Sequence, residues 1–114
     1  MQNLILAINP GSTSTKIAVY QRNRQVFINT IRHSLEKINS FPNVVSQFEF
    51  RRDLIIKELH GADIDLNQID VVMGRGGFLR PIPSGVYEVN ESMIRDLTSV
   101  TLGEHASNLG GIIA

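Results

Sequence analysis

The 114-residue sequence contains no cysteine and no tryptophan. Without cysteine the chain has neither a disulfide framework nor a thiolate metal site, so we expect a reducing compartment, most simply the cytoplasm. No apolar run approaches the roughly 18 residues of a membrane span, and the apolar N-terminal stretch lacks the basic flank of a signal peptide. We therefore expect no membrane partner.

An excess of charge of either sign is also missing. Lys+Arg and Asp+Glu both number 11, which gives no global attraction for nucleic acid. The 42% hydrophobic content is typical of one globular domain. Any binding of an anion must therefore depend on local groups.

The first half of the chain predicts strands followed by a helix. Residues 3–9, 15–21 and 25–32 carry β-branched and aliphatic side chains that alternate, as expected for three antiparallel strands. After the break at 40–43, apolar residues return at helical spacing until 60–62. Arg51 and Arg52 are expected on the solvated face of this helix.

The second half continues the alternation of strands and helices. Residues 69–73 read as a short buried strand that leads directly into glycines. Asn90 is a plausible N-cap for a helix to about Ser99, and a last helix is expected to start near Ser107. The predicted fold class is α/β, with a mixed sheet opened by three antiparallel strands and with flanking helices.

A polar hairpin separates the first two predicted strands. Its sequence is Asn9-Pro10-Gly11-Ser12-Thr13-Ser14-Thr15-Lys16. Gly11 permits close backbone approach, and the hydroxyl groups of Ser12, Thr13, Ser14 and Thr15 could converge with backbone N–H groups on a small anion. Lys16 could add charge, although the alternation of the strand could point it elsewhere. The alternative is an ordinary Ser/Thr-rich turn.

Two further residues are candidates for a site. Arg75 lies at a strand end among Gly74, Gly76 and Gly77, where its planar guanidinium could bind a carboxylate or phosphate. The alternative is a surface arginine on a flexible turn. His105 just precedes the last helix and could donate a hydrogen bond to a phosphoryl group, although a capping or surface role is common for such a histidine.

The remaining candidates are weaker. His33 and His60 have no partners at metal-ligand spacing and are expected at the surface or at the ends of elements. Arg80 could line the same cleft as Arg75 or brace its loop.

Three segments together resemble the acetate/butyrate kinase family, and within it the butyrate kinase branch. They are residues 9–16, the segment Gly74-Arg75-Gly76-Gly77-Phe78-Leu79-Arg80-Pro81-Ile82, and the segment Glu104-His105-Ala106-Ser107-Asn108-Leu109-Gly110. The resemblance runs along essentially the whole chain but covers only about the first third of such an enzyme. The first segment is shared with other actin-like ATPases, whereas the other two are more specific.

The resemblance implies a ribonuclease-H-like lobe of the actin-like ATPase type. It also implies an ATP-dependent transfer of the γ-phosphoryl group to a short-chain carboxylate, with Mg²⁺ as cofactor, which gives an acyl phosphate. The residue matching Asn9 lies near the phosphoryl group and the metal. An amide lacks the charge of the aspartate found in sugar kinases, so the metal is expected to be held mainly by nucleotide, water and residues outside this chain. The arginine matching Arg75 grips the carboxylate, with Gly76 and Gly77 beside it, and the histidine matching His105 steadies the phosphoryl group.

Departures from the family pattern bear on the substrate. Acetate kinases resemble this chain but have bulkier residues around the equivalent arginine, so Gly74, Gly76 and Gly77 imply a longer pocket that favours butyrate or a branched acid. Acetate or propionate kinase is the alternative within enzymes, and a non-catalytic remnant or binding module is the alternative outside them. Residues 1–114 are expected to be a single truncated N-terminal lobe of a two-lobe kinase, inactive by itself and homo-oligomeric when full length.

Overall fold

The computed structural model describes residues 4–76, 83, 85–99 and 105–114. It has a four-stranded mixed sheet in the order β3-β2-β1-β4. The strands are β1 (Leu4–Pro10), β2 (Ser14–Gln21), β3 (Arg24–Arg32) and β4 (Ile69–Gly74). The helices are α1 (Leu35–Asn39), α2 (Phe48–Gly61), α3 (Glu91–Thr98) and α4 (Asn108–Ile113), with 3₁₀ turns η1 (Val45–Gln47) and η2 (Leu66–Gln68).

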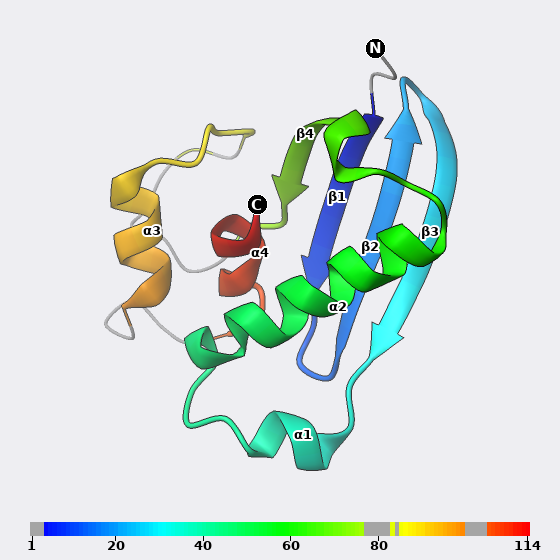
Figure 1. Cartoon of the computed structure of the whole chain (residues 1–114). Coiled ribbons are helices and arrows are strands. Elements are labelled where there is room, and N and C mark those ends of the chain that lie inside the picture. Colours follow the sequence, from blue (N-terminus) through cyan, green and yellow to red (C-terminus); the bar gives the residue numbers. More distant parts are fainter. Residues whose placement is uncertain (1–3, 77–82, 84, 100–104) are drawn as a thin grey trace.

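Strand β1 lies between β2 and β4 in the sheet. β1 pairs antiparallel with β2, β2 pairs antiparallel with β3, and β1 pairs parallel with β4. The carboxyl ends of β1 and β4 therefore meet at the same end of the sheet, beside the β1–β2 hairpin (Figure 1). Ligands of α/β proteins commonly bind at the carboxyl ends of the strands.

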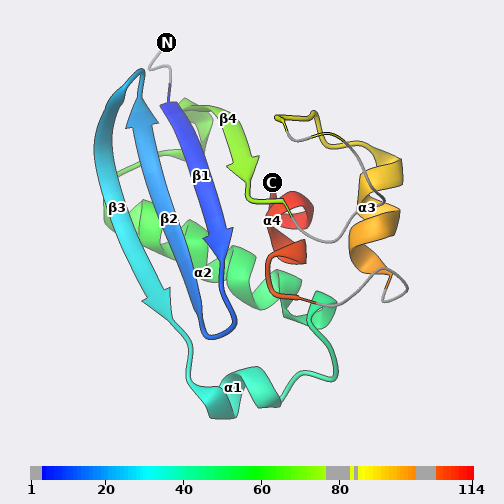
Figure 2. The same cartoon turned by 180° about the vertical axis from the view of Figure 1, so that it is seen from behind.

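One face of the sheet forms the core. Helix α2 crosses this face (Figure 1), and Figure 2 shows the strands from the opposite side. Alternation along the strands turns one set of apolar side chains toward α2, as the period of two requires. The buried cluster consists of Leu4, Leu6, Ile8, Ile17, Val19, Ile55 and Leu59.

Strand β4 differs from the prediction, which had a buried strand. Val71 and Met73 are 49% and 40% exposed, and Val72 is 38% exposed. The reason is that β4 is the last strand of the described sheet and has only β1 as a neighbour. An apolar run predicts burial on both faces, but it does not reveal whether the neighbouring elements are there to provide it.

The helices follow the predicted signals with one addition. Asn90 caps α3 by accepting a hydrogen bond from the Met93 N–H at 2.9 Å, as predicted, and α4 begins directly after Ser107. Helix α1 was not predicted; the Ser34 hydroxyl caps it by accepting from the Lys37 N–H. At five residues it is too short to carry a periodic pattern.

None of the helices in the described residues is long and apolar enough to cross a membrane.

Candidate active site at the carboxyl ends of β1 and β4

Asn9, Lys16 and Arg75 share one face of the sheet, opposite the core. Asn9 lies directly across from Lys16 in the antiparallel ladder, so their side chains project to the same side. The Arg75 N–H donates to the Ile8 carbonyl at 3.0 Å, which extends the β1–β4 ladder by one residue. The Arg75 guanidinium reaches Asn9, with 3.5 Å between Nη1 and Oδ1. Asn9 and Arg75, which are 66 positions apart in the sequence, are thus in contact. Together with Lys16 they form a cationic corner of the sheet.

The hairpin next to this corner is tightly closed. The Gly11 N–H donates to the Ser14 carbonyl at 2.7 Å. A Cβ on Gly11 would lie 3.2 Å from the Ser14 hydroxyl, so any larger residue would press against the turn. Ser12 and Thr13 are exposed at its tip. Thr15 is fully buried on the core side, which corrects the expectation that its hydroxyl group faces an anion with the others.

Arg51 lies beneath the hairpin, which corrects its prediction as a solvated residue. Its side chain is fully buried, and Nη1 donates to the carbonyls of Gly11 at 2.7 Å and Ser14 at 3.0 Å. Nη2 donates to the Ser12 carbonyl at 3.2 Å. Burial lowers the pKa of this guanidinium. The neighbouring Arg52 is exposed as predicted and pairs with Asp53.

His33 is also buried, whereas it was expected at the surface or at an element end. It does follow β3 directly, but it is only 7% exposed, and its Nε2 lies 2.8 Å from the Thr15 hydroxyl oxygen. Burial, and then the positive charge of Arg51, lower the pKa of His33 from 6.5 to about 4. Because Arg51 Nη1 donates to Thr15 Oγ1 at 3.3 Å, the Thr15 proton can be given to Nε2 only if the ring is uncharged. His60 is exposed in the last turn of α2, as predicted.

The buried His33 leads to a pH dependence of stability. The unfolded chain takes up a proton near pH 6.5, whereas folded His33 does so only near pH 4. Stability from this group is therefore full above pH 6.5 and is lost as the pH falls toward 4, by up to about 3 kcal/mol. Urea unfolding at pH 7 and pH 4.5 should show a smaller difference for His33→Gln than for the wild type. His60→Gln is the control and should keep the wild-type difference; an unchanged pH dependence in His33→Gln would contradict the assignment.

His105 is exposed three residues before α4. Its Nδ1 accepts a hydrogen bond from the Ser107 N–H at 3.0 Å. In the neutral ring the proton then belongs to Nε2, which is the tautomer that can donate from that nitrogen.

Helix α4 is fixed to the site by a contact between two glycines. A Cβ on Gly74 would clash with the carbonyl group of Gly110, and a Cβ on Gly110 would clash with the carbonyl oxygen of Arg75. The missing side chain at Gly74 thus makes room for α4, a packing role that was not predicted. Gly74 also lines an apolar cavity beside β4, so the longer pocket stays a prediction. Open space does surround the Cα atom of Gly76, because a Cβ there would meet nothing within 4 Å. Gly77 and Arg80 lie outside the described residues.

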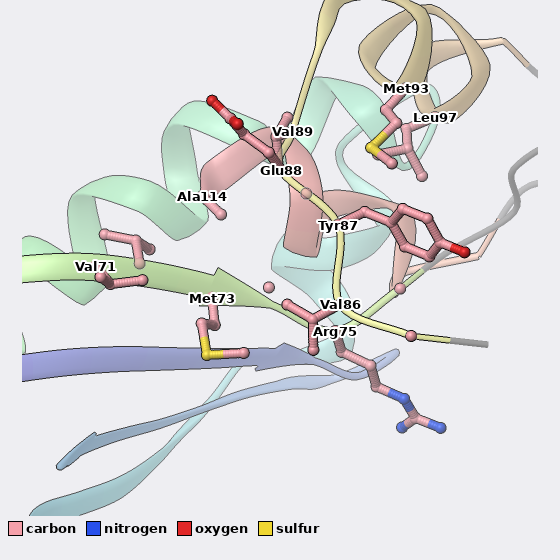
Figure 3. Close-up of a pocket in the computed structure, with 15 residues that line it drawn as sticks. Val71, Met73, Arg75, Val86, Tyr87, Glu88, Val89, Met93, Leu97 and Ala114 are labelled. Carbon is pink, nitrogen blue, oxygen red and sulfur yellow. The ribbon is translucent and has the colours of Figure 1, made fainter. Parts of the chain in front are cut away.

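A cavity of about 560 Å³ lies beside β4. Its lining is mostly apolar and comes from β4, residues 85–89, α3 and α4, with Arg75 at one side. In Figure 3 the Arg75 guanidinium points away from Met93 and Leu97, toward the end of β1. The described residues 83 and 85–89 form no strand.

The chain is similar to Butyrate kinase 2 of Clostridium acetobutylicum. The two sequences are 51% identical over 114 residues, which is all of this chain and 32% of the relative. This identity confirms the resemblance to the butyrate kinases drawn from the three segments. The chain spans about a third of the length of that relative. No family model matches the sequence of this chain.

Arg51 and His33 are the residues that sequence reasoning missed. A signal for Arg51 was present, because Gln47, Arg51, Ile55 and Leu59 recur every four residues and all four are buried. A basic residue on the same helix face as buried apolar residues indicates a buried cation with a defined partner. For His33 the sequence offers no comparable signal.

Proposed function

We propose that this chain is one lobe of a two-lobe cytoplasmic kinase that transfers the γ-phosphoryl group of ATP to butyrate or a branched short-chain acid. The 51% identity to a butyrate kinase over the whole chain carries the proposal. The mixed sheet, with the ends of β1 and β4 adjacent, is what a ribonuclease-H-like lobe would require. A relative about three times as long supports the expectation of a second lobe. Like the second lobe, a homo-oligomeric state of the full-length enzyme stays a prediction.

In this proposal the hairpin receives the phosphoryl group and Arg75 receives the carboxylate. A carboxylate oxygen attacks the γ-phosphorus, the bond from the γ-phosphorus to the bridging oxygen breaks, and ADP leaves. Arg75 and Lys16 would offset the negative charges that must approach each other, and His105 would donate to the transferring group from Nε2. The apolar cavity beside Arg75 supports a substrate with a hydrocarbon tail.

The residues fit a phosphate better than they fit a metal ion. The hairpin offers backbone and hydroxyl donors, which suit phosphate oxygens. No group of three acidic or histidine side chains suitable for a metal ion occurs among the described residues, and Asn9 brings only an uncharged amide to the corner. Mg²⁺ commonly relies on carboxylates and nucleotide phosphates, so we assign no step to the metal from this chain.

A substrate panel tests the proposal on the full-length protein. With ATP and acetate, propionate, butyrate or isobutyrate, hydroxamate trapping should detect acyl phosphate, with kcat/KM greatest for butyrate or isobutyrate. Each added methylene that fits the pocket is expected to change kcat/KM by about 10-fold or more. Preference for acetate would favour the acetate kinase alternative. A protein that forms no acyl phosphate from any of the four acids would favour the non-catalytic module.

A further inference from the structure

Arg51 is a buried cation for which the described residues supply no acidic partner. Its side chain is fully buried, and in the described part of the chain the recorded ion pair joins Arg52 and Asp53 instead. Gln47 accepts from Nε at 3.0 Å and from Nη2 at 2.8 Å, which aligns the guanidinium. Burying a charge is costly unless its donors are satisfied. Here backbone carbonyls of the hairpin satisfy them.

These contacts hold the backbone of the hairpin in one orientation. The carbonyls of Gly11, Ser12 and Ser14 accept from Arg51. The Thr13 carbonyl accepts from the His33 N–H at 2.8 Å. Every carbonyl group from residue 11 to residue 14 is therefore bound on the protein side.

The N–H groups of Ser12 and Thr13 must then point the other way. In a trans peptide the N–H of a residue is directed opposite to the carbonyl of the preceding residue, and no cis bond occurs among the described residues. Because the Gly11 and Ser12 carbonyls face the guanidinium, the Ser12 and Thr13 N–H groups face outward, where both residues are exposed. The permanent positive charge of Arg51 lies directly behind these outward donors.

We propose that Arg51 is the positioning residue of the anion site formed by residues 11–14. It contacts no ligand; it turns the hairpin donors outward and places a charge beneath them. The identity of the anion as the terminal phosphate of ATP rests on the proposed function. The geometric role of Arg51 does not.

The test measures the affinity of the full-length protein for two nucleotides by calorimetry. AMPPNP, a non-hydrolysable ATP analogue, carries the terminal phosphate, and AMP lacks it. Arg51→Gln should weaken AMPPNP binding by about 10- to 100-fold, as expected for lost charge-assisted hydrogen bonds, and change AMP binding less than about 2-fold. Arg51→Lys keeps the charge but cannot form the fork, and should recover only part of the loss. Arg52→Gln, at the adjacent exposed position, is the matched control and should bind both nucleotides like the wild type.

Circular dichroism melts separate this role from a loss of fold. If Arg51→Gln fails to fold, Gln47→Ala carries the test, because it releases the guanidinium from its acceptor and should weaken AMPPNP selectively by about 3-fold or more. Equal weakening of AMPPNP and AMP, or unchanged AMPPNP binding in folded Arg51→Gln, would overturn the proposal. A wild type that does not bind AMPPNP would overturn it too. A wild type that binds AMPPNP but forms no butyryl phosphate would overturn only the proposed function.

Discussion

Gly110→Ala is expected to lower the free energy of unfolding by about 3 kcal/mol. The added methyl group would clash with the carbonyl oxygen of Arg75 and lie 3.0 Å from its nitrogen. Both atoms belong to Arg75, whose N–H group donates to the Ile8 carbonyl of β1, so this backbone cannot easily move aside, and overpacking against a fixed neighbour is costly. The higher helix propensity of alanine, worth up to about 1 kcal/mol, offsets only part of this cost. Urea unfolding measures the difference.

Two other glycines supply controls of graded severity. Gly61→Ala places its methyl group in open space and should change stability by no more than about 0.5 kcal/mol or raise it slightly. Gly111→Ala approaches only Leu97 Cδ1, at 2.7 Å, and a side-chain end can shift, so about 1 kcal/mol is expected. A Gly110→Ala variant as stable as Gly61→Ala would show that α4 does not pack on β4 in this way.

Arg75→Ala is expected to lower kcat/KM for butyrate by about 100- to 1000-fold in the full-length protein. The guanidinium is exposed at the end of β4 and reaches Asn9, so its loss removes the fork-shaped donor from the corner where the carboxylate is proposed to bind. The KM for butyrate should rise and kcat should fall. The KM for ATP should change less, because the hairpin and Arg51 remain.

Arg75→Lys and Arg52→Ala complete this experiment. Lysine keeps the charge but not the planar fork, so it should restore activity only in part. Arg52→Ala removes an exposed arginine from α2 and should leave both KM values unchanged. Unchanged kinetics in Arg75→Ala would end its assignment to the carboxylate.

Much of the fold was predictable because its signals are local. The alternation in residues 4–10 and 14–21, and the capping residue Asn90, act over a few positions, so the strands and α3 were expected close to their observed bounds. The exposure of β4 was not predictable in the same way. It depends on which elements lie beside the strand, and the apolar run of 69–73 contains no information about that.

The candidate site likewise has residues that could be predicted from the sequence and residues whose roles depend on distant parts of the chain. Arg75 was chosen from its glycine pattern and Asn9 from the family resemblance, and the parallel pairing of β1 with β4 brings them together. The meaning of Gly74 could not be found from its neighbours in sequence, because the atom that excludes a side chain belongs to Gly110. Arg51 was misplaced because a charged residue on a helix usually faces solvent, and its acceptors are about 40 residues earlier in the chain.

Arg51 lies far from the hairpin in the sequence, and this separation limits how the site could be transplanted into another protein. The loop of residues 11–14 bonds only once within itself among its described backbone contacts, from the Gly11 N–H to the Ser14 carbonyl. The other contacts that hold its carbonyls come from Arg51 and His33. A graft of residues 9–16 alone would therefore transfer the amino-acid sequence of the loop but not its backbone conformation. A protein engineer would have to move both the first turn of α2, which carries Arg51, and the end of β3, which is followed by His33.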